Sequence, residues 1–289
     1  ASASTLFLIA RAWRRGLTTR RAAMIGAALA VGVLSKLTFL ALVPGAGLAL
    51  LLLAWRERPA GSRRALAVAA TGIAVAAVPV GLYLLLNVAA WSRSSPTAGG
   101  LASVTAGPVG GSSGVGWHET LDYAWELYLP RLPFLNHNYF PNQVYPLWSV
   151  WLRGSIGDFG LLDYAFPTWV YRDFQDLVYA LAALGAIAIW RLRAAIRPLL
   201  GLFACYGVTA LGLLAVIGYL GAQAAIEKQP PFPQARYLFP LLALYALAIV
   251  LACKALPRRW APVLGALLVA LAFAHNLFAE TLTISRYYG

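Results

Sequence analysis

The amino-acid sequence predicts an all-α, polytopic transmembrane helical bundle. Hydrophobic residue types occupy 61% of the 289 positions and charged residues only 11%, whereas a soluble domain carries about 25% charged residues. Long apolar stretches recur along the chain, and most of its positive charge lies in the short connections between them. Together these observations exclude a soluble globular domain.

Seven apolar segments lie at 22–35, 37–55, 65–91, 174–190, 198–220, 237–253 and 261–279. A helix rises about 1.5 Å per residue and the hydrocarbon core is about 30 Å thick, so most of these segments are long enough to cross it. The expected organisation is an N-terminal transmembrane part (1–91), a long loop (92–175) and C-terminal transmembrane helices (176–289). Residues 1–13 lack both a Met and a basic signal-peptide region, so we expect a truncated first span and a chain that is a fragment.

The basic residues predict the orientation of these helices. Fifteen of the 23 Lys and Arg residues lie in four short connections that hold a single acid, Glu57. Short basic connections face the cytoplasm, so the net charge of +13 indicates topology rather than nucleic-acid binding. The sequence thus predicts a multi-pass plasma-membrane protein with loop 92–175 outside. The fifteen are Arg11, Arg14, Arg15, Arg20, Arg21, Arg56, Arg58, Arg63, Arg64, Arg191, Arg193, Arg197, Lys254, Arg258 and Arg259.

The stretch between Arg21 and Arg56 predicts a helical hairpin spanning 22–55. Its 34 mostly apolar residues would extend about 51 Å as one helix, and a single crossing would place one arginine cluster outside. We expect 22–35 to run outward over about 21 Å, a turn at 35–38, and 39–55 to return. Lys36 then lies at the tip, where its ammonium either contacts an anionic headgroup or simply reaches water. Span 65–91 follows this hairpin.

The extracytoplasmic loop has two predicted parts. Residues 94–116 are rich in Gly, Ser, Thr and Pro, which is typical of a flexible strap. Sixteen aromatic residues follow between 117 and 175, and they form either an interfacial belt or a platform for sugars. Residues 117–129 fit a short amphipathic helix along the membrane surface. Its apolar face would carry Leu121, Trp125 and Tyr128, and its acidic stripe Glu119, Asp122 and Glu126.

The polar residues of the loop give no strong indication of a metal or cofactor. Carboxylates can bind Mg²⁺ or Mn²⁺, but the acidic stripe is better explained as the solvated face of the helix. His118 and His137 are expected to be surface residues rather than catalytic ones. Cys205 and Cys253 lie in apolar runs and predict buried thiols. We therefore expect no cofactor, with a divalent metal as the open alternative.

Two motifs hold the candidate substrate-binding residues, one at 154–167 and the other at 233–240. Arg236 lies at the outer mouth of an apolar segment, where a guanidinium can form paired hydrogen bonds with phosphate oxygens or anchor the helix at the interface beside Tyr237. Asp158 and Asp163 either orient a sugar hydroxyl or cap turns between glycines.

Three patterns occur in order: Gly-x-Leu-Ser-Lys-Leu-Thr at 32–38, Phe-Gly-x-Leu-Asp-x-x-x-Pro at 159–167 and Arg-Tyr-Leu-Phe-Pro at 236–240. With them the chain resembles, over nearly its whole length, a bacterial family of polytopic membrane proteins common in actinobacteria. That family is similar to the GT-C glycosyltransferases, which include protein O-mannosyltransferases and the aminoarabinose transferase of lipid A.

The resemblance implies a GT-C-like fold and transfer of a sugar from a polyprenyl-phosphate carrier to an extracytoplasmic glycan, lipid or protein. It places an acidic catalytic base in the first outer loop, which would lie upstream of residue 1. Lys36 and Arg236 would hold the carrier phosphate, beside Tyr237, because a phosphate leaving group needs cations. Asp158 and Asp163 would contact the sugar or the acceptor.

Two other classes of function remain open at this stage. A flippase or transporter of envelope polysaccharide would need ionisable residues deep inside its spans, and most of the apolar segments have none between their ends. A noncatalytic assembly subunit would keep the helices and tolerate loss of Lys36 and Arg236.

Overall fold

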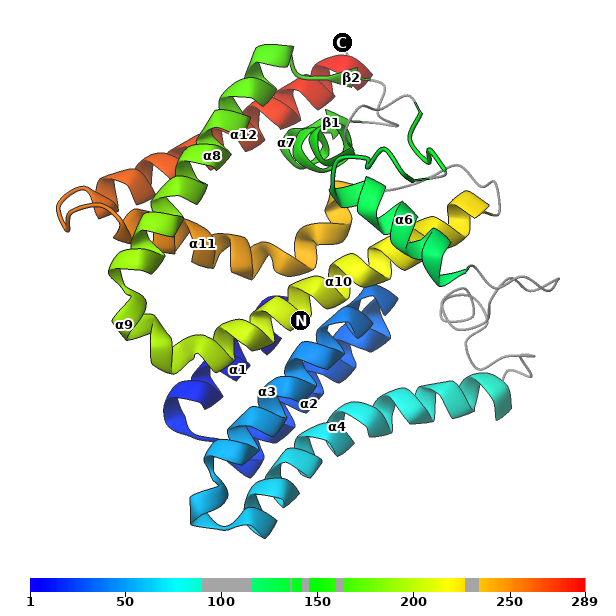
Figure 1. The fold of residues 1–289 in the computed structure, drawn as a ribbon, viewed down its shortest axis with the longest axis vertical. Coiled ribbons are helices and arrows are strands. Elements are labelled where there is room, and N and C mark those ends of the chain that lie inside the picture. Colours follow the sequence, from blue (N-terminus) through cyan, green and yellow to red (C-terminus); the bar gives the residue numbers. More distant parts are fainter. Residues whose placement is uncertain (90–115, 136, 142–145, 160–163, 227–233, 289) are drawn as a thin grey trace. The chain divides into compact units, whose positions relative to one another are not determined.

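A computed structural model of the chain describes residues 1–89, 116–135, 137–141, 146–159, 164–226 and 234–288 (Figure 1). This part of the chain is helical apart from one antiparallel pairing of two short strands, β1 (Asp158–Phe159) and β2 (Tyr164–Ala165). Six of the helices are long and apolar enough to span a membrane. The chain therefore has the character of a multi-pass membrane protein, and its prediction as an all-α fold is confirmed except for the strand pair.

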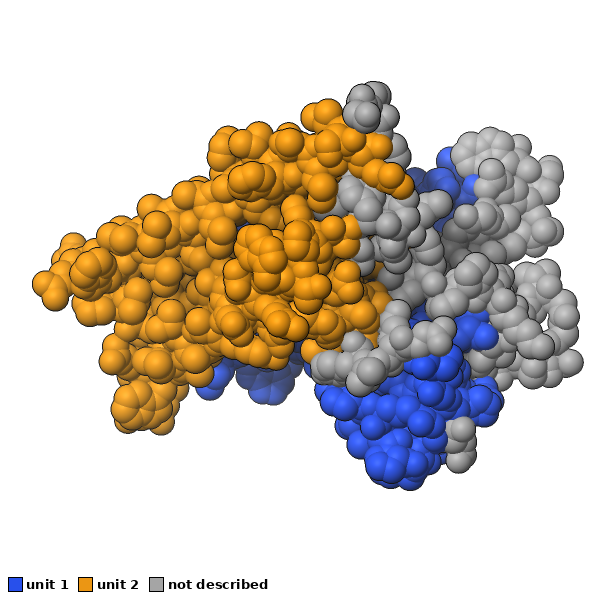
Figure 2. Space-filling model, turned by 90° about the horizontal axis from the view of Figure 1, so that it is seen from above, with its two compact units in different colours: residues 1–145, 199–233, 237–243 blue, residues 146–198, 234–236, 244–289 orange. Residues whose placement is uncertain are grey.

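The described residues form two compact units (Figure 2). The first unit contains the N-terminal helices together with α10, and the second contains the remaining C-terminal helices with α7. The predicted boundary at residue 175 falls inside a helix that begins at Thr168. The 3₁₀ turn η5 (Ala235–Leu241) contributes residues to both units.

The described residues of the first unit form six α-helices and two 3₁₀ turns, besides the part of η5 that belongs to it. Its apolar core includes Ile9, Ile25, Leu50 and Leu213, each at most 2% exposed. The elements are α1 (Ser2–Arg15), α2 (Thr19–Ser35), η1 (Leu37–Leu42), α3 (Val43–Arg56), η2 (Arg58–Ala60), α4 (Ser62–Ala89), α6 (Trp117–Tyr128) and α10 (Leu200–Ile226).

The second unit is dominated by three long helices whose apolar side chains are largely exposed, as expected for helices that face lipid. Almost none of the apolar window of α12 is buried. The elements are the π-helical turn η3 (Leu147–Leu152), α7 (Arg153–Ile156), β1, β2, α8 (Thr168–Arg191), α9 (Arg193–Ile196), α11 (Leu242–Lys254) and α12 (Ala261–Tyr288), with the 3₁₀ turn η4 (Arg197–Leu199) leading from α9 to α10.

The hairpin predicted between Arg21 and Arg56 is present. Helix α2 ends at Ser35, and Lys36 adopts an extended conformation that breaks it. The Phe39 ring of η1 then lies against Gly32 of α2. At the other end of the hairpin, the Leu17 N–H donates to the Glu57 carboxylate (3.3 Å), so α3 returns to the level at which α2 began.

The arginine-rich connections of the first unit lie at one end of it. The Arg56 guanidinium donates to the Trp13 carbonyl oxygen (3.4 Å) and stacks on the Trp13 ring. The same ring fills the space beside Gly201, at the start of α10. Within the second unit, Arg191 at the end of α8 donates to the Ala255 carbonyl oxygen after α11 (2.7 Å). In each unit the basic connections thus share an end, as the charge pattern requires; the side of the membrane that they face stays a prediction.

Candidate functional site

Lys36 lies at the end of the first unit away from the arginine-rich connections. The Ser35 hydroxyl donates to the Val31 carbonyl oxygen (2.6 Å), and the Lys36 N–H donates to the Gly32 carbonyl oxygen (2.9 Å). These bonds cap the last turn of α2 and leave the Lys36 side chain exposed. Its ammonium nitrogen lies 5.5 Å from the centre of the Tyr237 ring, which is within the range of a cation–π interaction.

Of the five predicted substrate-binding residues, the structure brings Lys36 and Tyr237 together. Arg236 precedes Tyr237 in η5, has an exposed side chain and belongs to the second unit. Asp158 lies in β1, opposite Ala165. The Asp158 side chain, and Asp163 as a whole, lie outside the described residues. The substrate-binding roles of all five residues stay predictions.

Helix α6 confirms the short helix expected at 117–129, but its packing differs from the prediction. Tyr123 and Leu127 are at most 1% exposed and form the buried face, which packs on α10. The Tyr123 ring occupies the space where a side chain at Gly221 would stand. The Tyr128 hydroxyl donates to the Leu214 carbonyl oxygen (2.9 Å). Tyr128 therefore contacts α10, whereas Leu121, two turns earlier in the helix, is 61% exposed.

One exposed face of α6 is apolar. Trp117 is 81% exposed, Leu121 61% and Trp125 39%, and their spacing of four residues places them in one row along the helix. Burial raises the pKa of Tyr123, on the opposite face, to about 12, so its phenol is neutral at physiological pH. His118 and His137 are both exposed, as expected.

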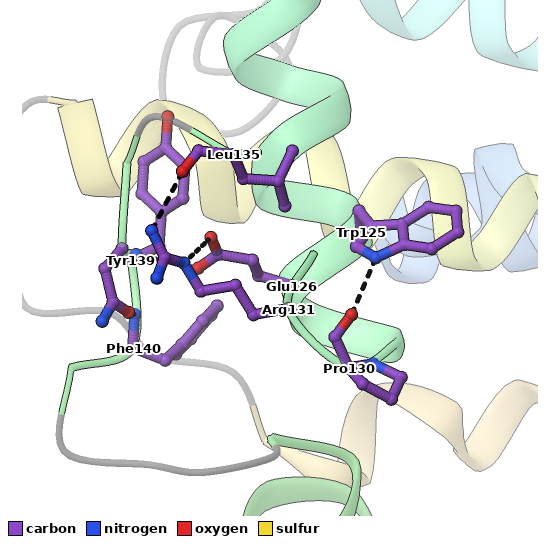
Figure 3. Close-up of polar contacts among 8 residues, drawn as sticks. Trp125, Glu126, Pro130, Arg131, Leu135, Tyr139 and Phe140 are labelled. Atoms are coloured by element: carbon purple, nitrogen blue, oxygen red, sulfur yellow. Dashed lines mark hydrogen bonds and ion pairs between the residues drawn. The ribbon is translucent and has the colours of Figure 1, made fainter. Parts of the chain in front are cut away.

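Glu126 was expected on a solvated acidic stripe, and this prediction was wrong because the residue is only 2% exposed. One carboxylate oxygen accepts from Nε of Arg131 (3.2 Å) and the other from the N–H of Tyr139 (2.9 Å) (Figure 3). Arg131 also donates to the Leu135 carbonyl oxygen (3.0 Å). Glu126 therefore holds the segment after α6 against the helix.

Burial and the carboxylates of α6 both act on the phenol of Tyr139. Desolvation raises the pKa of Tyr139, with smaller contributions from Glu119, Asp122 and Glu126. The centre of the Tyr139 ring lies 5.2 Å from that of Tyr123, in an edge-to-face arrangement, and 5.8 Å from that of His137, with which it stacks. The result is an aromatic cluster beside a fixed ion pair, outside the membrane-spanning helices.

Replacing Glu126 with alanine is expected to release the segment 130–140 from α6. The change leaves the Tyr139 N–H without its acceptor and Arg131 without its carboxylate, which costs about 1–3 kcal/mol for the buried hydrogen bond. Because Arg131 is 43% exposed, the guanidinium regains water and adds little to that cost. Limited proteolysis should show faster cleavage within 130–140.

Glu119→Ala provides the matched control on the same helix. The Glu119 carboxylate accepts only from the exposed Gly116 N–H (3.3 Å) among the described residues, so its loss should leave the cleavage rate within twofold of the unmodified chain. Equal cleavage of both variants would show that Glu126 does not hold the segment.

A second arrangement, which the sequence analysis missed, lies around α7 in the second unit. The Tyr171 hydroxyl donates to the Gly157 carbonyl oxygen (2.6 Å) and accepts from the Phe166 N–H (2.8 Å). His275 of α12 hydrogen-bonds through Nε2 to the Ile156 carbonyl oxygen. These contacts fix the end of α7 between α8 and α12. Arg153, the first residue of α7, places its guanidinium 4.7 Å from the centre of the Tyr171 ring.

A signal for Arg153 was present in the sequence. It is a basic residue outside the four arginine-rich connections, inside the aromatic half of the long loop. The roles of Tyr171 and His275 had no such signal, since their partners are backbone carbonyl oxygens that only the fold brings near.

A cavity of about 680 Å³ lies between α8 and α12 in the second unit. Its walls are mainly apolar, with Phe174, Leu271 and Phe278 among them, and His275 also lines it. The His275 ring lies 5.3 Å from that of Phe166 and 5.0 Å from that of Phe174.

Within the described ranges, no group of three or more His, Cys, Asp or Glu residues is placed to hold a metal ion. Comparison with protein-family models, with curated proteins and with solved structures finds no match for this chain.

Proposed function

We propose that the chain belongs to a membrane glycosyltransferase of GT-C type, which moves a sugar from a polyprenyl-phosphate carrier to a cell-envelope glycan, lipid or protein. The observation that carries the proposal is Lys36 at the tip of the hairpin, beside Tyr237. The tip is the end of the first unit remote from the arginine-rich connections. A cation at this position can attract the phosphate of a lipid whose hydrocarbon chain stays in the bilayer.

The chemistry at Lys36 suits a phosphate leaving group. The ammonium is exposed, so it is free to meet a ligand, and the Tyr237 ring limits where it points. Cations arranged before the reaction stabilise negative charge that develops on a departing phosphate. Arg236, the residue before Tyr237 in the chain, carries a guanidinium, a group that is likewise suited to phosphate oxygens. Tyr237 and Arg236 belong to the motif that carries the family resemblance.

The test is a transfer assay with the complete natural protein reconstituted in proteoliposomes. Polyprenyl-phosphate-linked sugars and the corresponding nucleotide sugars are offered as donors, and incorporation into added envelope acceptors is measured. We expect incorporation from the lipid-linked donor alone. Incorporation from nucleotide sugars would overturn the proposal. A failure of incorporation with every donor would overturn it as well.

The same proteoliposomes distinguish the transport alternative. A flippase moves the intact lipid-linked sugar to the other leaflet, where added periodate or glycosidase modifies it, without releasing polyprenyl phosphate. A transferase releases polyprenyl phosphate in equal amount to the sugar transferred. Release without translocation supports the proposal, and translocation without release contradicts it.

A further inference from the structure

Arg153 carries a charge that no described residue neutralises. Its Nε atom is buried, and none of the described residues accepts a hydrogen bond from it. Its guanidinium lies over the face of Tyr171, with the Cζ atom 4.7 Å from the ring centre. A buried donor on a charged group is costly when it has no acceptor, so the position favours an anionic ligand.

The platform beneath this guanidinium is fixed. Tyr171 is 1% exposed, and its hydroxyl is bonded both to Gly157 and to Phe166. The Gly157 N–H in turn donates to the Arg153 carbonyl oxygen (2.8 Å), which joins the first residue of α7 to the same network. His275 holds the adjacent carbonyl of Ile156. A guanidinium on such a support is prepared for binding before the ligand arrives.

The segment that carries a second arginine, Arg236, contacts α7 within the same unit. A Cβ atom added at Gly154 would lie 3.2 Å from the Cβ of Ala235, so α7 and the first residue of η5 are in close contact. Arg153 precedes one of these residues and Arg236 follows the other. Each of the two contacting segments therefore carries one arginine, and two guanidinium groups together can bind the several oxygens of a phosphate.

We propose that Arg153 is a phosphate-binding residue, acting with Arg236 on the phosphate group of a membrane lipid. The choice of a lipid rather than free phosphate rests on the proposed function and on the membrane-spanning helices α8 and α12 that hold the platform. Binding through Arg153 does not itself require sugar transfer, so the two proposals can fail separately.

The experiment measures binding to the full chain in nanodiscs with three probes: farnesyl phosphate, farnesol and inorganic phosphate. We expect farnesyl phosphate to bind most tightly and Arg153→Gln to raise its Kd at least tenfold, because a charge-assisted hydrogen bond is lost. Arg172→Gln is the matched control. Arg172 adjoins Tyr171 on α8 and is exposed, so its loss should change the Kd less than twofold.

Each remaining outcome decides the proposal. The proposal would be overturned by equal Kd values for the Arg153→Gln and Arg172→Gln variants, or by equal affinity for farnesol and farnesyl phosphate. Equal affinity for inorganic phosphate and farnesyl phosphate would exclude a lipid as the source of the phosphate. If Arg153→Gln does not fold, Arg153→Lys keeps the charge but loses the paired hydrogen bonds and should weaken binding severalfold, whereas unchanged affinity contradicts the proposal.

Thermal unfolding tests whether Arg153 instead forms an ion pair with an acidic residue of this chain. Asp158→Asn and Asp163→Asn remove the two acids of the neighbouring motif. One outcome is that either Asp variant lowers the Tm as much as Arg153→Gln does, while all three variants keep the Kd for farnesyl phosphate unchanged. In that case Arg153 forms an ion pair within the chain, and the inference is wrong. If transfer by the complete protein fails while Arg153-dependent binding persists, only the proposed function is lost.

Discussion

Lys36→Ala is expected to reduce transfer by the complete protein about 100-fold or more while leaving its fold intact. Removing one group that stabilises developing negative charge typically costs this much. The fold should tolerate the change because Lys36 is exposed and its described contact is the Tyr237 ring. An exposed cation–π contact contributes only about 0.5–1 kcal/mol to stability. The measurement is the initial rate of transfer from the lipid-linked donor, with the Tm recorded for the same preparation.

Lys254→Ala is the matched control for charge. Lys254 ends α11 at the arginine-rich end of the second unit, so its removal should change the rate less than twofold. Lys36→Arg keeps a cation and should retain a substantial part of the activity. Tyr237→Phe keeps the ring and should behave like the unmodified protein. Normal transfer by Lys36→Ala would remove Lys36 from the proposed phosphate site.

Gly45→Ala is expected to destabilise the first unit strongly. Gly45 is buried in α3, where an added Cβ would overlap Thr209 Oγ1 and lie 2.7 Å from the Cys205 carbonyl oxygen of α10. The Thr209 hydroxyl cannot easily turn away, since it donates to that same carbonyl oxygen (2.9 Å). Overpacking of this kind costs about 1–3 kcal/mol, and here a backbone atom blocks relaxation. Thermal unfolding in detergent should show the loss.

Gly47→Ala gives the opposite expectation on the same helix. A Cβ at Gly47 meets no atom within 4 Å, and alanine is a better helix former than glycine by about 1 kcal/mol. The Tm of Gly47→Ala should therefore equal or exceed that of the unmodified chain. A Tm for Gly45→Ala as high as that for Gly47→Ala would show that α3 and α10 do not pack closely in solution.

The long helices and the hairpin could be predicted because their signals are local. Seven apolar segments appear as helices, six of them long enough to span a membrane. The first arm, α2, has 17 residues and is the short one expected. The turn at Lys36 could be predicted because the apolar stretch between two arginine clusters is too long for one span. A single crossing would also place one of the clusters on the extracytoplasmic side of the membrane.

The packing of α6 could not be predicted, because periodicity shows which residues share a face but not which partner covers that face. Glu126 lies on the same side as other acids by spacing, yet it is buried and accepts hydrogen bonds from Arg131 and from the backbone of Tyr139. The partner surface of Tyr123 exists only because α10 has glycine at 221. That complementarity joins positions about a hundred residues apart.

By itself, the sequence determined the membrane character of this protein, its helical segments and the common ends of its basic connections, because partition between lipid and water depends on local composition and charge. The tertiary structure decided which polar groups meet. Only the fold places the Lys36 ammonium beside the Tyr237 ring, and only the fold leaves Arg153 on the Tyr171 platform without a described acceptor. Such pairings depend on side-chain contacts between distant segments, and neither hydropathy nor spacing along the chain carries that information.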